Sequence, residues 1–186
     1  MKREIRSDEI RCGDRVSEED TLATGSRGKP RRFVKKNRSV PPSTVVPILV
    51  YPDVRAAVTF LTAAFGFVER TRIGEHHRAQ MAVGVDGAVI LADVGGDRSG
   101  PRPSGNSLTI RVRVDDVDAA FARACCIGAV VVEAPVDREY GERDCSLGDP
   151  GGHCWQLAQS VADVAPEDFG CTTVSPWPVY HSSGTT

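Results

Sequence analysis

The chain has 186 residues, of which 40% are hydrophobic and 26% are charged, and its formal net charge is -2. A single globular domain of this size buries roughly 70% of its unfolded surface. No apolar run approaches the roughly 20 residues of a membrane helix, and the cysteines lack the paired spacing of a zinc site or a disulfide scaffold. We therefore expect a cytoplasmic protein with reduced thiols and no membrane partner.

Residues 1–36 differ in charge from the rest of the chain. The first 38 residues hold 12 of the 23 Lys and Arg but only 7 of the 25 Asp and Glu, so the remainder is acidic. The segment lacks a periodic apolar face and is predicted to be a disordered basic extension. Such a run can contact phosphates, but Phe33 is its single aromatic side chain for base stacking. We expect a solvated extension rather than a nucleic-acid-binding arm.

The first organised part, module one, is predicted over about residues 44–94. A β-branched run predicts a strand over Val45–Tyr51, and a helix follows with Asp53 as its N-cap and Gly66 at its end. The helix has apolar residues at helical spacing. Three further strands are predicted at Val68–Ile73, His77–Val83 and Ala88–Asp93. The order of elements is βαβββ.

The same order returns in module two, predicted over about residues 106–160. The strand SLTIRVRV leads to a helix with Asp116 as its N-cap, and Asp116 follows Asp53 by 63 residues. The stretch AVVVE continues the module, and the turn GDPGG joins two last strands, Arg143–Leu147 and His153–Ala158. The chain therefore contains two copies of one supersecondary unit.

Four motifs point to a known family: AFGF at the end of the first helix, VDDVDA before the second, and then YGER and DPGGHCWQLAQ. With the paired modules, they resemble the vicinal oxygen chelate superfamily of glyoxalases, ring-cleaving dioxygenases and bleomycin-resistance proteins. The resemblance runs over residues 37–170, which leaves residues 171–186 as a C-terminal tail. It implies an α+β fold in which paired βαβββ modules form a cup-shaped mixed sheet. It also implies a homodimer, because family members usually complete or bury their cups by pairing modules, within the chain or across a two-fold axis.

The resemblance also implies where a metal would be held. Metal-dependent members place ligands on the first and last strands of each module, which correspond here to Val46, Leu91, Thr109 and Gln156. Of these four side chains, Gln156 alone is a good ligand, whereas a divalent metal needs at least three N, O or S donors. We expect neither a metal nor another cofactor.

Strand alternation predicts which side chains line the cup. In SLTIRVRV the apolar residues face the helices, so that Thr109 and Arg111 face the other way. By the same parity Trp155 belongs to the core and Gln156 to the cup. We place Arg143 at the entrance, on the loop before the last hairpin, where its planar fork could hold a carboxylate or phosphate. The predicted ligand-binding residues are Arg78, Gln80, Thr109, Arg111, Arg143 and Gln156.

Three side chains are candidates for proton transfer: His153 at the exit of the GDPGG turn, and Tyr140 and Glu142 on the loop before the hairpin. Few acids share the predicted cup face, Asp93 being the clearest. An unpaired buried guanidinium is costly. We therefore expect an anionic ligand to supply part of the pairing of Arg111.

Three hypotheses on function follow, in order of preference. The first is a protein that binds a small anionic or aromatic molecule without a metal. The second is a metal-independent isomerase or lyase in which His153, Tyr140 or Glu142 moves a proton and Arg143 stabilises negative charge. The third is a non-catalytic, dimeric interaction module. The preferred hypothesis is not an enzyme.

Overall fold

The computed structural model describes residues 37–102 and 108–174. The predicted extension at 1–36 and most of the predicted tail lie outside the described residues. Module one contains five elements in the predicted order: β1 (Ile48–Tyr51), α1 (Val54–Phe65), β2 (Val68–Ile73), β3 (Arg78–Val83) and β4 (Gly87–Asp93). Module two repeats them as β5 (Thr109–Arg113), α2 (Val117–Cys126), β6 (Val130–Asp137), β7 (Glu142–Gly148) and β8 (Cys154–Ser160). A short 3-10 helix, η1 (Pro166–Phe169), follows.

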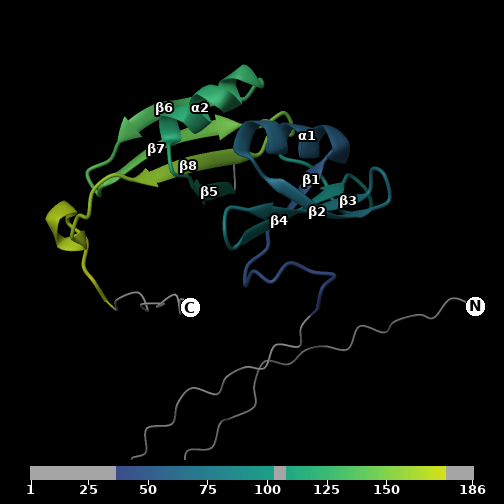
Figure 1. Cartoon of the computed structure of the whole chain (residues 1–186), viewed down its shortest axis with the longest axis horizontal. Helices are drawn as coiled ribbons and strands as arrows, with labels where there is room; N and C mark the ends of the chain where they lie inside the picture. The colour runs from purple at the N-terminus through teal and green to yellow at the C-terminus, as the bar shows by residue number, and fades with distance from the viewer. Residues whose placement is uncertain (1–36, 103–107, 175–186) are drawn as a thin grey trace, which may run out of the picture. The chain divides into compact units, whose positions relative to one another are not determined.

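Each module forms its own four-stranded mixed sheet, with the strand orders β1-β4-β3-β2 and β5-β8-β7-β6 (Figure 1). The first strand of each module pairs in parallel with the last, and the other pairs are antiparallel. This repetition confirms the predicted α+β fold of paired βαβββ modules. The strand predicted to begin at Val45 is shorter, since β1 begins at Ile48.

Local sequence signals account for both helices. The Asp53 side chain accepts hydrogen bonds from the backbone N–H groups of Arg55 and Ala56, and Asp116 accepts one from Ala119. These carboxylates satisfy N–H groups that have no partner within the helix. At the end of α1, Gly66 adopts a φ of 74°, a conformation that glycine enters without strain. The predicted helix boundaries are confirmed at these positions.

The hydrophobic core lies between the helices and the sheets. Apolar residues at alternate strand positions face α1 and α2, for example Leu49 and Leu91 in module one and Leu147 and Leu157 in module two. The two cores meet at Trp155, whose ring lies 5.5 Å from that of Phe65 and 5.4 Å from that of Phe67. Trp155 is therefore a core residue, as its parity predicts.

A buried carboxylate also joins the modules. Asp149 accepts hydrogen bonds from the Tyr51 hydroxyl at 2.6 Å and from Trp155 Nε1 at 2.9 Å. Its other oxygen accepts from the backbone N–H groups of Gly151 and His153. Gly151 is needed for this approach, because a Cβ there would lie 2.4 Å from the Tyr51 ring. The GDPGG turn thus anchors module two to β1 of module one.

Among residues 37–102 and 108–174, the structure contains no helix with the length and apolar character that a membrane span requires.

Both helices lie on the same side of the two sheets and contact each other (Figure 1). One contact between them is specific, because Arg123 of α2 donates to the carbonyl oxygen of Ala64 at the end of α1. The opposite face of each sheet, here called the open face, carries no helix from the described part of the chain.

Candidate functional site

The open face of module two carries a row of polar side chains. Arg111 and Gln156 are register partners in the parallel pair β5–β8, and Arg111 Nη1 donates to Gln156 Oε1 at 2.7 Å. Thr109 lies one step along the same face, opposite Cys154, and is exposed. Strand parity therefore placed Thr109, Arg111 and Gln156 on one face, and the structure brings the last two into contact.

Asp144 of β7 is the centre of this polar face. Its side chain is fully buried and accepts hydrogen bonds from Arg138 Nε at 2.9 Å, the Tyr140 hydroxyl at 3.0 Å and Gln156 Nε2 at 3.3 Å. Burial by itself would raise the pKa of Asp144, but the hydrogen bonds from Arg138 and Tyr140 outweigh it and hold the pKa below its ordinary value. Asp144 is ionised at neutral pH.

Sequence reasoning missed Asp144, although a signal for it was present. In RDCSLG the buried Cys145 and Leu147 alternate with Asp144 and Ser146, so Asp144 shares the open face with Gln156. Glu142 lies on the same face and binds Arg111 and Arg113, the latter at 2.6 Å. The expectation that few acids share this face is therefore wrong.

The charges on this face balance within the chain. Arg111 pairs with Glu142 and Asp144, and Arg138 pairs with Asp144 and Glu133. Internal carboxylates thus supply the partner of Arg111 that was expected from an anionic ligand. Asp93, the acid expected to face the cup, instead pairs with His77 of module one and with Arg98, which follows that module.

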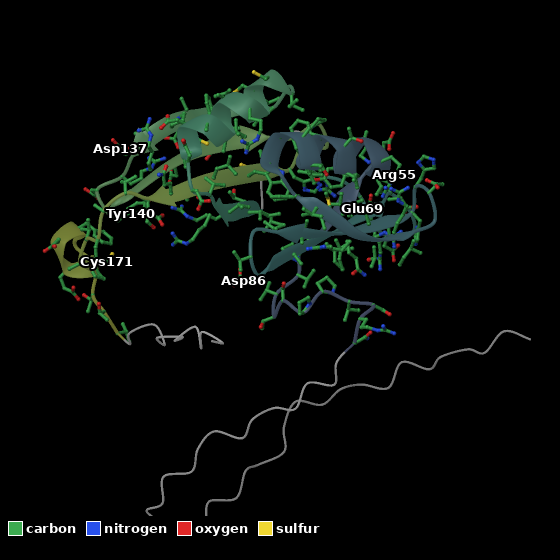
Figure 2. The ribbon with its side chains drawn as sticks, viewed as in Figure 1. Arg55, Glu69, Asp86, Asp137, Tyr140 and Cys171 are labelled. Carbon is green, nitrogen blue, oxygen red and sulfur yellow. The ribbon has the colours of Figure 1, made fainter. Side chains whose placement is uncertain are left out.

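Arg143 does not lie at the cup entrance. It belongs to β7 rather than to a loop, and its parity with Cys145 sends its side chain to the helix side of the sheet. There its Nε and Nη2 donate to both oxygens of Asp118, at 2.8 and 2.9 Å, and Nη1 donates to Asp137 at 2.8 Å. The guanidinium joins α2 to β6, and its nitrogens already donate to two carboxylates of the chain. Figure 2 shows Asp137 and Tyr140 at the same end of module two.

The three proton-transfer candidates all have partners in the chain. His153 Nε2 donates to the carbonyl oxygen of Val50 at 3.0 Å, and its ring lies 4.6 Å from that of Tyr51. Tyr140 donates to Asp144. Burial would raise the pKa of Glu142, but hydrogen bonds from Arg113 and Arg111 lower it. A carboxylate held ionised in this way is a weak base at neutral pH.

The open face of module one carries the other two predicted binding residues. Gln80 is 9% exposed and donates through Nε2 to the carbonyl oxygen of Ser39 at 3.0 Å. Arg78 shares this face two residues earlier on β3, and its Nε is buried without a hydrogen-bond partner in the described part of the chain. Arg78 and Gln80 therefore lie in a different module from Arg111 and Gln156.

A cavity of about 730 Å³ adjoins the polar face of module two. Three segments line it: the β3–β4 turn at residues 83–87, β5 and its end at 111–115, and the end of β8 at 158–160. Arg111 and Arg113 belong to this lining, and Gln156 does not. The cavity is within the size range of small-molecule sites.

Comparisons with known proteins agree with this architecture. The family model described as Glyoxalase/Bleomycin resistance protein/Dioxygenase superfamily matches residues 44–157, more than half of the chain. The chain belongs to this superfamily.

Individual proteins are also similar to this chain. Protein Mb0911c of Mycobacterium bovis is 36% identical over 132 residues, which cover 66% of this chain and 87% of that protein. The crystal structure of TioX from Micromonospora sp. ML1 has a TM-score of 0.52 at 28% identity and covers 66% of this chain and 100% of that one. A glyoxalase/bleomycin resistance protein/dioxygenase from Nocardioides has a TM-score of 0.53 at 22% identity, over 68% and 89% of the two chains, and shows the fold alone.

The metal positions that the superfamily implies need one correction. Leu91 is fully buried in the core, on the helix side of β4. In β1–β4 the register pair Ile48 and Ile90 corresponds to Arg111 and Gln156 in β5–β8, so Ile90 is the open-face counterpart of Gln156. Val46 and Ile90 are both apolar and offer a metal no donor. The side chains at these positions do not fit a divalent ion.

Within residues 37–102 and 108–174, no three His, Cys, Asp or Glu side chains are grouped so that they could hold a metal ion.

Proposed function

We propose that this superfamily member is a binding protein that holds a small organic molecule in the cavity beside Arg111 and Arg113, without a metal ion. The observation that carries the proposal is the position of this cavity beside a pre-formed network of polar side chains. Gln156 and Asp144 hold Arg111, the member of this network that lines the cavity, so the remaining hydrogen-bonding capacity of Arg111 is offered in a fixed geometry. The β3–β4 turn supplies Val83 and Val85 as an apolar wall.

The network also indicates the ligand's charge. Each arginine of this face already has a carboxylate partner, so an anion would have to compete with Glu142 or Asp144. A neutral molecule with hydrogen-bonding groups and an aromatic or aliphatic body suits the cavity better. The isomerase or lyase alternative has less support, because it needs a free proton acceptor and His153 and Glu142 are engaged.

Native mass spectrometry of the freshly purified chain tests the proposal by identifying a bound molecule. Its affinity is then measured by calorimetry with Ser160→Trp, which fills the cavity from the end of β8, and with Ala63→Trp on the exposed side of α1 as the matched control. We expect Ser160→Trp to weaken binding by about tenfold or more and Ala63→Trp to leave it unchanged. Equal affinities for both variants would refute this site.

Metal independence is tested separately by elemental analysis. We expect far less than one zinc, nickel or iron per chain, because the apolar Val46 and Ile90 occupy two of the four implied ligand positions. A content near one metal per chain that disappears in Gln156→Ala would contradict the proposal.

A further inference from the structure

Residues 38–43, here called the strap, cross the open face of module one, on the side of the sheet opposite α1 (Figure 1). Two side-chain hydrogen bonds hold the strap. Gln80 Nε2 donates to the carbonyl oxygen of Ser39 at 3.0 Å, and the Ser43 hydroxyl donates to the carbonyl oxygen of Asp86 at 2.6 Å. Between the strap and the sheet lies a pocket of about 300 Å³. This pocket and the cavity of module two share residues 85–87 of the β3–β4 turn but are otherwise lined by different segments.

The arginines of this pocket differ from those of module two in having no carboxylate partner among the described residues. Arg38 and Arg70 line it, and in the described part of the chain neither has a carboxylate within 4.0 Å. The four arginines of strands β5 and β7 and of the β6–β7 turn are all paired, by contrast. Asp86 is the single carboxylate in the lining and is exposed on the side of module one away from α1 (Figure 2). Positive charge therefore prevails in the pocket.

The pocket also contains a buried hydroxyl group without a partner. Thr71 Oγ1 has almost no solvent access and makes no hydrogen bond within the described residues, and Thr71 is the register partner of Gln80 across β2–β3. A buried polar group without a hydrogen bond is unfavourable, so that such groups in native proteins usually call for an explanation. Ala82, Val40 and Pro41 supply an apolar wall beside Thr71.

We propose that the pocket beneath the strap binds a small molecule with a carboxylate or similar anionic group. Arg70 and Arg38 contact the anion, and the apolar wall holds the body of the molecule. Charge-assisted hydrogen bonds from arginine are the strong contacts here. The site is distinct from the cavity beside Arg111 and does not depend on ligand binding there.

Benzoate and benzamide form a matched pair of probes, because they differ mainly in charge. We expect saturable binding of benzoate to the full-length protein at millimolar concentration, and benzamide about tenfold weaker, at constant ionic strength. Amide chemical shifts in NMR spectra should change around Thr71 and Gln80. Equal binding of the two probes, no saturable binding of benzoate, or shifts confined to Arg111 and Gln156 would overturn the proposal.

Four substitutions then test the residues. Arg70→Met should weaken benzoate binding by about tenfold, and Arg72→Met, which removes a charge paired with Glu69 on the other face of β2, should leave it unchanged. Asp86→Asn should strengthen binding about twofold, because it removes the negative charge of the lining. Thr71→Val should leave both binding and the melting temperature unchanged, since the hydroxyl is covered and has no partner to lose. Unchanged affinity in Arg70→Met would refute the site even if benzoate binds.

Discussion

At the scale of single residues, the polar face of module two depends on Asp144. Its carboxylate is buried and accepts hydrogen bonds from side chains of the β6–β7 turn, β5 and β8. A buried charge is tolerated only when such partners satisfy it, and each partner is left unpaired when the charge is removed. Asp144 therefore determines where Arg111, Arg138 and Gln156 are held.

Asp144→Asn should lower the free energy of unfolding by about 3 kcal/mol at pH 7, because Arg138 and Arg111 lose a buried counter-charge. The folded-state pKa of Asp144 is depressed, so this stabilisation is present above the unfolded value near 3.8 and is lost as the pH falls below it. The difference between wild type and variant should shrink on acidification. Urea denaturation at pH 7 and near pH 3 measures it, and a pH-independent difference would contradict the assignment.

At the scale of elements, the two modules are joined by the GDPGG turn and β1. Burial and the neighbouring Asp149 raise the pKa of Tyr51 far above its ordinary value, so the phenol keeps its proton and donates a hydrogen bond to the carboxylate. The contact between the modules is not limited to this hydrogen bond, because the Tyr51 ring also packs on the His153 ring. Its strength sets how rigidly the two open faces are held with respect to each other.

Tyr51→Phe should reduce stability by about 1–3 kcal/mol, since Asp149 loses one of its buried donors. A double-mutant cycle with Asp149→Asn separates this hydrogen bond from general packing. We expect Tyr51→Phe to cost less in the Asp149→Asn background than in wild type. Equal costs in both backgrounds, measured by chemical denaturation, would show that Tyr51 acts through packing alone.

At the scale of the whole molecule, one edge strand leaves apolar side chains in solvent. In β6, Val130, Val131 and Val132 are 63%, 50% and 64% exposed. β6 is the edge of its sheet, and an exposed apolar edge strand tends to be covered by another chain. A partner subunit would bury this surface.

We predict that the protein is a homodimer. Light scattering at micromolar concentration should give twice the 20.0 kDa mass of one chain. A single species of 20.0 kDa over the whole concentration range would refute this prediction.

Deletion of residues 1–36 should leave the melting temperature within a few degrees of wild type. The contacts that hold the strap begin at Ser39 and are kept in this truncation. Deletion of residues 1–43 is the control and should lower the melting temperature, because both strap hydrogen bonds are lost. A large fall on removal of residues 1–36 alone would contradict the predicted boundary.

Local pattern was enough to predict the two modules, the helix caps and the faces of Arg111, Gln156 and Trp155 on their strands. Asp53 and Asp116 cap helices because a carboxylate reaches N–H groups two or three residues ahead, an interaction contained within one stretch of sequence. Strand alternation has a period of two residues, so that parity placed Arg111 and Gln156 on one face and Trp155 in the core.

The partners of these side chains were decided by tertiary structure alone. Arg111 meets Glu142 and Asp144, 31 and 33 residues away, through the register of β5, β8 and β7. Arg143 meets Asp118 of α2, 25 residues away, and His153 meets Val50 of the other module. Sequence alone determined which groups lie on a face, since that depends on the backbone of one strand. Which carboxylate neutralises which arginine depends on strand register and module docking, which bring together residues far apart in the chain.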